Sequence, residues 1–175
     1  MLYRRVVLFN FNKWLDRILN NYLESYLEKY LSKNLLSQHL VFGDKSRLKI
    51  AETAIVNNAL LNLSSGDITI EDYVFFGHNV SVITGTHDYH KFRRERQVTI
   101  PKTGRDVVIK EGAWIASNVT ILGPCTIGEH SVVAAGALVK EDVPPCTIVA
   151  GLPARVIKKI TNVNNSVDAN HELLN

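Results

Sequence analysis

Aliphatic residues recur every six positions through the second half of the chain. They are Ile109, Ile115, Ile121, Ile127, Val133 and Val139. Four positions after each stands a small or β-branched residue, in the order Ala113, Val119, Cys125, Ser131, Ala137 and Val143. An α-helix would scatter this pattern, because six residues are not a whole number of helical turns. The period instead predicts a β-solenoid, in which each unit is one short strand and one turn and the aliphatic side chains stack into a continuous core.

The same period extends toward the N-terminus with two interruptions. Residues in phase occur at Ile50, Val56, Ile70, Phe76 and Val82. Between Val56 and Ile70 the phase slips by two residues, and residues 64–67 mark a small insertion. A second interruption predicts a long loop over residues 86–107, within a solenoid domain of residues 41–158. An antiparallel domain of hairpins is the alternative, but the chain contains neither Asn-Gly nor Asp-Gly.

Residues 1–35 follow a different pattern, in which apolar pairs are spaced by four. The pairs are Trp14 and Leu15, Ile18 and Leu19, Tyr22 and Leu23, Tyr26 and Leu27, and Tyr30 and Leu31. This spacing predicts an amphipathic α-helix in an N-terminal segment of residues 1–40. The apolar stripe turns by about 40° per repeat, which favours a helix that wraps around its own solenoid or a neighbouring subunit. Membrane binding of the helix is not expected, because its polar face mixes both charge signs.

Composition and charge narrow the possible partners. The chain has 175 residues, and its net charge of +3 is too small to argue for nucleic acid, although it suits a ligand that carries phosphates. Cys125 and Cys146 lack zinc-type spacing, so we expect reduced thiols and no metal site. With no secretory signal or membrane-spanning stretch, we expect a cytoplasmic protein. The polar tail, residues 159–175, is expected to be mostly disordered.

The predicted loop carries the candidate chemistry. His87 follows the small residue Thr86, as Trp114 follows Ala113, so the repeat places both side chains outward from equivalent positions. A histidine at the root of a long loop on a rigid scaffold is a candidate functional residue. The loop is also net basic, through Lys91, Arg93, Arg94, Arg96, Lys102 and Arg105 against Asp88, Glu95 and Asp106.

Three segments carry a family resemblance. They read ITGTHDYH from residue 83, WIASNVTILGPCTIGEHSVVAAGALV from residue 114, and VAGLPARVI from residue 149. They resemble the galactoside and maltose acetyltransferase branch of the hexapeptide-repeat acyltransferases, over about residues 50–158. The chain also resembles bacterial enzymes that O-acetylate sugars of capsules and exopolysaccharides. The resemblance implies a left-handed parallel β-helix, acetyl-coenzyme A as co-substrate, a carbohydrate acceptor, and a homotrimer with active sites between subunits.

The same resemblance implies the catalytic residues. His87 matches the family's general base, which takes a proton from the acceptor hydroxyl so that the oxygen attacks the thioester directly. Trp114 matches the residue that borders the acetyl and acceptor site, and the backbone N–H of Ser117 matches an oxyanion donor. The asparagine that orients the acceptor matches Asn57, with Asn62 as its rival because the phase slips between Asn57 and His87.

Coenzyme and acceptor residues follow from the same matches. Four small residues are expected along the pantetheine arm: Ala116, Ser117, Ala135 and Gly136. Lys140 and Arg155 are the candidates for further coenzyme contacts, with Arg155 placed to meet the nucleotide phosphates. His90, Arg93 and Arg94 are expected to face the acceptor. The basic loop has two explanations that stay open: attraction of an anionic carbohydrate, or charges that solvate the loop or reach the coenzyme phosphates.

Three other functions compete with sugar O-acetylation. N-acetylation of an amino sugar would use the same residues, and the sequence does not separate the two. A metal-dependent hydratase on the same solenoid needs a pair of histidines separated by four residues, which this chain lacks. A non-catalytic assembly module is disfavoured by the presence of both His87 and Trp114.

Overall fold

The computed structural model describes residues 2–35 and 38–161. The chain divides into two units, Met1–Gln38 and His39–Asn175, and each is described by itself. The polar tail from residue 162 lies outside the described residues, and so does the expectation of disorder for it.

In the described part of the first unit, the chain forms one long helix, α1, over Leu2–Leu35. Between residues 13 and 31 all its side chains are exposed, including the apolar pairs. Tyr22, Tyr26 and Tyr30 stack in series, with ring centroids 6.3 and 6.2 Å apart, because residues four apart are neighbours on a helix. Over its full length α1 has no single apolar face, since a spacing of four turns the stripe around the axis. The predicted helix is thus present, with the turning apolar stripe that its spacing implies. Of the described helices, none is long and apolar enough to span a membrane.

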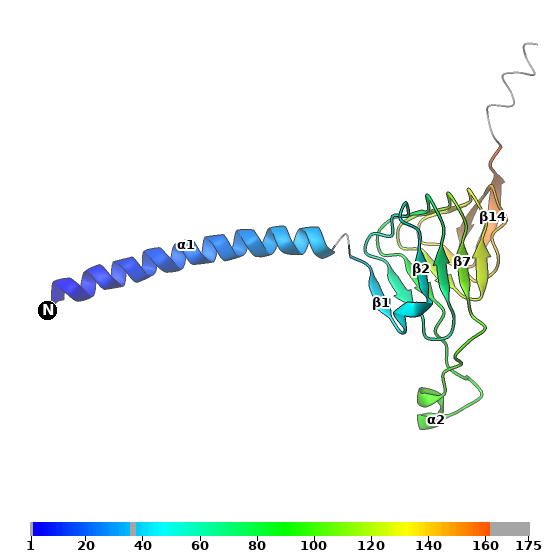
Figure 1. Cartoon of the computed structure of the whole chain (residues 1–175), viewed down its shortest axis with the longest axis horizontal. Helices are drawn as coiled ribbons and strands as arrows, with labels where there is room; N and C mark the ends of the chain where they lie inside the picture. Colours follow the sequence, from blue (N-terminus) through cyan, green and yellow to red (C-terminus); the bar gives the residue numbers. More distant parts are fainter. Residues whose placement is uncertain (1, 36–37, 162–175) are drawn as a thin grey trace, which may run out of the picture. The chain divides into compact units, whose positions relative to one another are not determined.

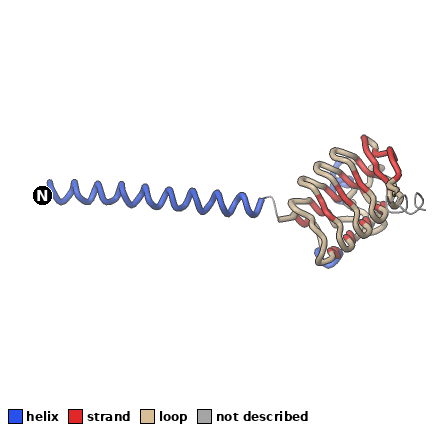
Figure 2. The backbone as a smooth tube through the Cα atoms, turned by 90° about the horizontal axis from the view of Figure 1, so that it is seen from above, coloured by secondary structure: helices blue, strands red, loops and turns tan. Residues whose placement is uncertain are grey.

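The second unit is a solenoid of three sheets, A, B and C (Figures 1 and 2). Sheet A contains β1 (Leu40–Phe42), β3 (Leu60–Asn62), β6 (Ser81–Ile83), β9 (Thr120–Leu122) and β12 (Leu138–Val139). Sheet B contains β2 (Leu48–Ile50), β4 (Ile68–Ile70), β7 (Val107–Ile109) and β10 (Cys125–Ile127). Sheet C contains β5 (Phe75–Phe76), β8 (Trp114–Ile115), β11 (Val132–Val133), β13 (Thr147–Gly151) and β14 (Ala154–Lys159). Each coil passes through A, B and C in turn.

The six-residue period is confirmed by the register of these sheets. Parallel pairing sets Leu61, Val82, Ile121 and Val139 side by side in sheet A. In sheet B the same alignment joins Ile50, Ile70, Ile109 and Ile127. All six aliphatic residues of the repeat from Ile109 to Val139, and all six of their small or β-branched companions, are buried. The inward positions therefore form one continuous apolar column, as the sequence predicts.

The phase slip resolves into two opposite changes. Leu61 takes the inward position opposite Val82, five residues after Val56 instead of six. Ile70 follows nine residues later, so three residues are inserted where sheet A passes to sheet B. Gly66, in this insertion, has no room for a side chain because a Cβ there would meet the backbone of Arg105.

Two short helical elements were not predicted. The long interruption contains a short helix, α2, over Arg93–Val98, and a 3₁₀ turn over Lys45–Arg47 precedes β2.

At the C-terminal end the chain reverses after Gly151, and β14 pairs antiparallel with β13, whereas the strand pairs within the solenoid coils are parallel. The reversal carries β14 to Lys159, one residue beyond the predicted end of the domain.

Burial controls the reactivity of Cys125, which occupies a corner of the repeat. Its side chain is 5% exposed, and burial, assisted by the charge of Asp142, raises the pKa of the thiol to about 12. A raised pKa means that the nucleophilic thiolate forms only in strongly alkaline solution. At pH 8 about one ten-thousandth of the thiol would be ionised. In a Cys146→Ser variant, we therefore expect no labelling by iodoacetamide at pH 8 in the native state and one equivalent after denaturation. Rapid labelling of the native variant would contradict this assignment.

Candidate active site

The corner between sheets A and B carries the long loop. The loop leaves the solenoid after β6 and returns at β7, and α2 lies in its outer part, away from the coils (Figure 1). The three-residue insertion after β3 leaves at the same corner, one coil earlier. We call this edge the A–B corner, and the other two edges the B–C and C–A corners.

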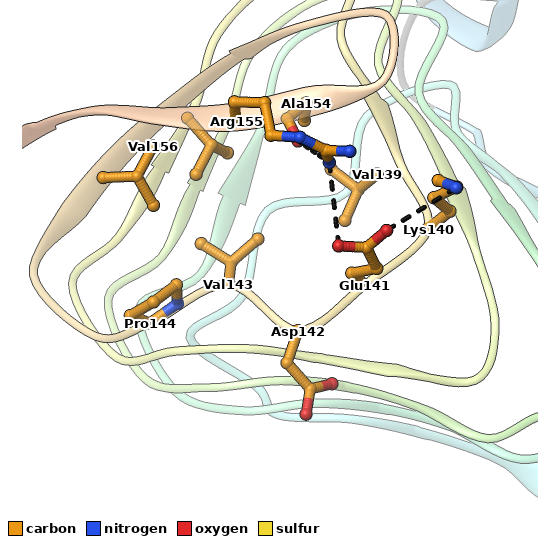
Figure 3. Close-up of a pocket in the computed structure, with 10 residues that line it drawn as sticks. Val139, Lys140, Glu141, Asp142, Val143, Pro144, Ala154, Arg155 and Val156 are labelled. Atoms are coloured by element: carbon orange, nitrogen blue, oxygen red, sulfur yellow. Dashed lines mark hydrogen bonds and ion pairs between the residues drawn. The ribbon is translucent and has the colours of Figure 1, made fainter.

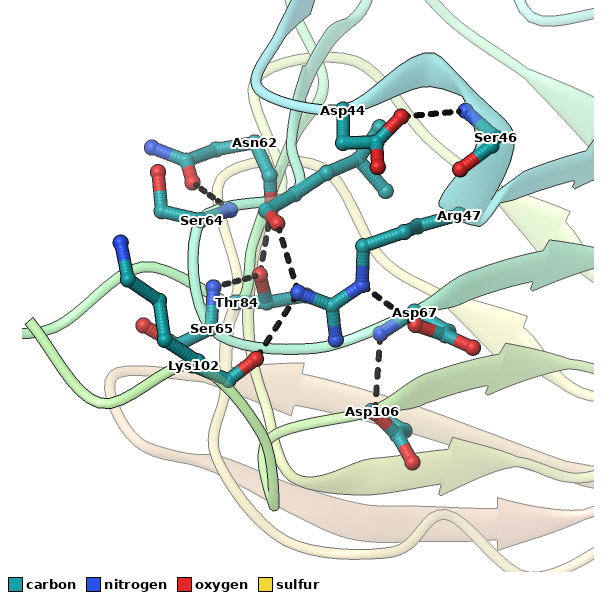
Figure 4. Close-up of polar contacts among 11 residues, drawn as sticks. Asp44, Ser46, Arg47, Asn62, Ser64, Ser65, Asp67, Thr84, Lys102 and Asp106 are labelled. Atoms are coloured by element: carbon teal, nitrogen blue, oxygen red, sulfur yellow. Dashed lines mark hydrogen bonds and ion pairs between the residues drawn. The ribbon is translucent and has the colours of Figure 1, made fainter.

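Arg47 anchors the returning limb of the loop (Figure 4). Its Nε donates to Asp67 Oδ1 at 2.7 Å, and its Nη1 donates to the carbonyl oxygens of Leu63 at 3.3 Å and Lys102 at 2.8 Å. One guanidinium thus joins the first coil, the insertion and the loop. Sequence reasoning missed this residue, which lies 55 positions from Lys102 and outside every motif.

A second arginine closes the base of the loop. Arg105 Nε donates to the carbonyl oxygen of Thr84 at 2.8 Å, and so connects the two limbs where they meet the solenoid. Beside it, the backbone N–H of Asp67 donates to Asp106 Oδ1 at 2.8 Å (Figure 4). Both limbs are therefore fixed to the coils at the point where His87 begins the loop.

The loop is also organised internally. The N–H of Asp88 donates to the Thr99 carbonyl at 3.2 Å, which links its two limbs. Lys91 and Glu95 form an ion pair at 2.8 Å, and the Glu95 carboxylate raises the pKa of Lys91. Arg96 Nε donates to the Lys91 carbonyl at 2.6 Å. Lys91 and Arg96 are thus engaged within the loop, so Arg96 does not belong with the cations expected to attract an acceptor.

His87 lies at the root of this loop with its side chain exposed. Its Nδ1 is 2.8 Å from the carbonyl oxygen of Arg96. A carbonyl oxygen can only accept a hydrogen bond, so Nδ1 must carry the proton and Nε2 must hold the lone pair of the neutral ring. Nε2 is therefore the basic nitrogen, as a general base at this position requires.

The two candidate asparagines occupy different corners. Asn57 lies at the C–A corner with φ 41°, and its Nδ2 donates to the Phe76 carbonyl at 2.7 Å. Asn62 ends β3 at the A–B corner, where its side-chain amide packs against Gly85, two residues before His87. The structure thus brings Asn62, and not Asn57, to the corner of His87.

Trp114 lies on a different face of the same chain. It begins β8 in sheet C with its side chain 44% exposed, and its ring stacks on Phe75 with centroids 5.7 Å apart. Sheet C is the face that does not border the A–B corner, so one chain does not bring Trp114 to His87. The positions are equivalent in the six-residue repeat, but successive repeats occupy three different faces.

The small residues expected along the coenzyme gather at the C–A corner. Gly136 N–H donates to the Ser117 carbonyl at 3.0 Å, which stacks Ala135 and Gly136 directly beside Ala116 and Ser117. Ser117 Oγ accepts from the backbone N–H of His78 at 3.1 Å. Gly136 has φ 71°, and a Cβ there would meet nothing within 4 Å. The glycine therefore serves the backbone turn, and the surface beside it is open.

Lys140 follows β12 at the A–B corner of the last coil, and Arg155 lies in β14 of sheet C with its side chain near Glu141 (Figure 3). Glu141 pairs with both, at 3.5 Å to Lys140 Nζ and 3.6 Å to Arg155 Nη1. They border a shallow pocket of about 170 Å³ that is also lined by Val139 and Val143. Ala135 and Gly136 precede β12 and Lys140 follows it, while Arg155 lies in β14 and is connected to Lys140 through Glu141.

The remaining acceptor candidates are exposed on the loop. His90 packs against Tyr89 with ring centroids 4.2 Å apart, and Arg93 and Arg94 are exposed in α2. Tyr89 and Phe92 are 75% and 71% exposed, and neither was predicted to be functional. Aromatic residues interleaved with basic residues in a long loop are the signal that could have identified them. Within residues 2–35 and 38–161, no three His, Cys, Asp or Glu side chains are placed to hold a metal ion.

Comparisons with known proteins identify relatives of the solenoid. The family model for the bacterial transferase hexapeptide (six repeats) matches residues 106–141. The crystal structure of a maltose O-acetyltransferase from Clostridium difficile 630 is 30% identical in sequence, covers 86% of this chain and 84% of that one, and has a TM-score of 0.59. A hexapeptide-repeat acetyltransferase from Vibrio cholerae O1 biovar eltor, complexed with acetyl coenzyme A, is also 30% identical, with 78% and 79% of the chains covered and a TM-score of 0.50.

This chain matches only part of the length of its curated relatives. The galactoside O-acetyltransferase of Escherichia coli K12 is 32% identical over 123 residues, which are 69% of this chain and 58% of that protein. The galactoside O-acetyltransferase of Lactococcus lactis IL1403 is 35% identical over 63% of this chain and 52% of its own length. This chain spans about half the length of the curated relatives it matches.

Proposed function

The chain belongs to the hexapeptide-repeat acetyltransferase family, and from that premise we propose that it transfers acetyl from acetyl-coenzyme A to a hydroxyl of a carbohydrate. The observation that carries the proposal is the His87 imidazole, whose Nδ1 is held by a carbonyl and whose Nε2 is left basic. We further propose a left-handed coil and a cytoplasmic protein, as the sequence predicts. The relatives' names support the sugar acceptor.

His87 would act as both base and acid in one direct transfer. Its Nε2 takes the proton of the acceptor hydroxyl while that oxygen forms a bond to the thioester carbonyl carbon and the C–S bond breaks. The resulting imidazolium returns the same proton to the departing thiolate, so no net proton is gained or lost. The Arg96 carbonyl, 2.8 Å from Nδ1, stabilises the imidazolium between the two steps. No residue forms an acyl intermediate.

The donor side of the site would use the C–A corner. The small residues Ala116, Ser117, Ala135 and Gly136 leave open surface beside the backbone, which fits a pantetheine arm pressed against it. We assign the oxyanion contact to the backbone N–H of Ser117. Lys140 and Arg155 would meet phosphates near the C-terminal end, where Glu141 now pairs with both.

The acceptor side would use the loop. We propose Asn62, in place of Asn57, as the residue that orients the acceptor, because only Asn62 shares the corner of His87. His90, Arg93 and Arg94 would contact the acceptor, and the exposed rings of Tyr89 and Phe92 offer apolar faces to a sugar. The exposed guanidinium groups favour an anionic carbohydrate, such as a uronic-acid or sialic-acid polymer or a nucleotide-linked sugar.

Removing the proposed base should abolish most of the activity. We expect His87→Ala to lower kcat by about 10²–10⁴-fold, the usual contribution of a general base. The fold should survive because the side chain is exposed. His130→Asn, at the B–C corner, is the matched control, since asparagine tolerates the φ of 53° found there. Thiol release from acetyl-coenzyme A measures both variants, and normal turnover by His87→Ala would exclude the assignment.

A site shared between subunits follows from the separation of His87 and Trp114. We propose a homotrimer in which these residues come from neighbouring chains. His87→Ala and Trp114→Ala should each be nearly inactive alone, whereas subunits unfolded and reassembled together should form intact sites. Random mixing in equal amounts predicts recovery of about a quarter of the wild-type activity. No recovery, or a 19.6 kDa monomer in sedimentation equilibrium, would contradict the shared site.

The exposed arginines should affect the acceptor and not the donor. We expect Arg93→Ala with Arg94→Ala to raise KM for an anionic oligosaccharide by about tenfold at low salt and to flatten its salt dependence. KM for acetyl-coenzyme A should be unchanged. Lys49→Ala, which removes an exposed charge from sheet B, is the control. An effect confined to the donor KM would assign these arginines to the coenzyme.

A further inference from the structure

We propose that Arg96 is a positioning residue that fixes the tautomer and orientation of the His87 imidazole. The inference deepens the proposed function, because it rests on His87 acting as the base. The side chain and the main chain of Arg96 contribute separately to holding His87. The side chain organises the segment that surrounds His87, and the main-chain carbonyl holds the ring itself.

The Arg96 guanidinium contacts the preceding segment of the loop, from Tyr89 to Phe92. Its Nε donates to the Lys91 carbonyl at 2.6 Å and its Nη2 donates to the Tyr89 carbonyl at 3.1 Å. Its Cζ lies 5.1 Å from the centre of the Phe92 ring, within the range of a cation–π contact. Two nitrogens of one planar fork thus hold two carbonyls two residues apart, which a single ammonium group does not reproduce.

The carbonyl of Arg96 is available to His87 because of where α2 ends. An α-helical carbonyl normally accepts from the N–H four residues later, but α2 ends at Val98. The Arg96 carbonyl therefore lacks that helical donor and accepts from His87 Nδ1 at 2.8 Å. The backbone N–H of Arg96 donates to the carbonyl oxygen of Phe92 at 3.4 Å, so both the main chain and the side chain of Arg96 contact the segment from Tyr89 to Phe92.

The tautomer matters for the reaction. A neutral imidazole in water populates both tautomers, and the form with the proton on Nε2 has no lone pair there to accept the acceptor's proton. The Arg96 carbonyl accepts only from the Nδ1–H form, so it selects the reactive tautomer and aims Nε2 away from the loop. Losing the guanidinium would release the limb from Tyr89 to Phe92 and, with it, the position of that carbonyl.

The test reads the imidazole itself. In protein labelled with ¹⁵N on its histidine rings, long-range ¹H–¹⁵N correlation at about pH 8, where imidazole is neutral, shows which nitrogen carries the proton. The His87 signals are identified by their loss in His87→Gln. We expect wild type to show the Nδ1–H tautomer and Arg96→Ala to show a mixture. In the same variant kcat should fall by about 10- to 100-fold, with KM for acetyl-coenzyme A within about twofold.

Two further variants separate geometry from charge and from loop stability. Arg96→Lys keeps the charge but loses the fork, so we expect a tautomer mixture like that of Arg96→Ala. Full retention of the Nδ1–H form in Arg96→Lys would show that charge alone suffices and would overturn the proposal. Glu95→Gln removes the neighbouring ion pair with Lys91 and should leave both the tautomer and kcat unchanged. A loss in Glu95→Gln equal to that in Arg96→Ala would also overturn it.

The remaining outcomes distinguish this inference from the proposed function. A single Nδ1–H tautomer in Arg96→Ala would overturn the inference and leave the acetyltransferase proposal intact. If wild type shows the Nδ1–H form, Arg96→Ala loses it, and wild type releases no thiol with any carbohydrate, the role of Arg96 stands and the proposed reaction falls.

Discussion

The structure depends on keeping each six-residue unit in register with the unit beneath it. Leu61, Val82 and Ile121 pair side by side in sheet A, and a slip of one residue would turn every inward side chain outward. Extra residues can therefore enter only where the chain turns. Both insertions leave at the A–B corner, and Arg47 ties them together across two coils. The geometry of the candidate site is thus set by the edge at which both insertions lie.

The apolar column was predictable, but its faces were not. Six-residue spacing identifies Ile109 and its successors as inward residues, because each must stack on the one below. It does not tell which of three sheets a given unit occupies, since a full coil takes three units. His87 and Trp114 are therefore equivalent in the repeat and separated in space. The same ambiguity, together with the phase slip, made Asn57 and Asn62 indistinguishable until the coil assigned each to its corner.

The loop was predictable as an interruption but not in its internal arrangement. Its arginines look alike in sequence and all three in α2 are exposed, yet Arg96 is held by two carbonyls and an aromatic ring. No period relates these residues, because the loop belongs to no coil. Arg47 shows the same limit over a longer range: its contact with Lys102 joins residues 55 positions apart. Only folding brings such partners together, so neither composition nor motif predicts them.

The reversal of the chain at Gly151 also determines how this protein can assemble. A stack of parallel coils ends in open strand edges, and such edges can recruit another copy and grow into a fibre. Here β14 runs back along β13, so the edge of sheet C that a further parallel coil would extend is already occupied by a strand of opposite direction. Arg155, Lys158 and Lys159 place positive charge on that strand. This arrangement discourages end-to-end polymerisation at the C-terminal end of the solenoid. The outer faces of the three sheets and their corners are left as the surfaces through which copies can meet.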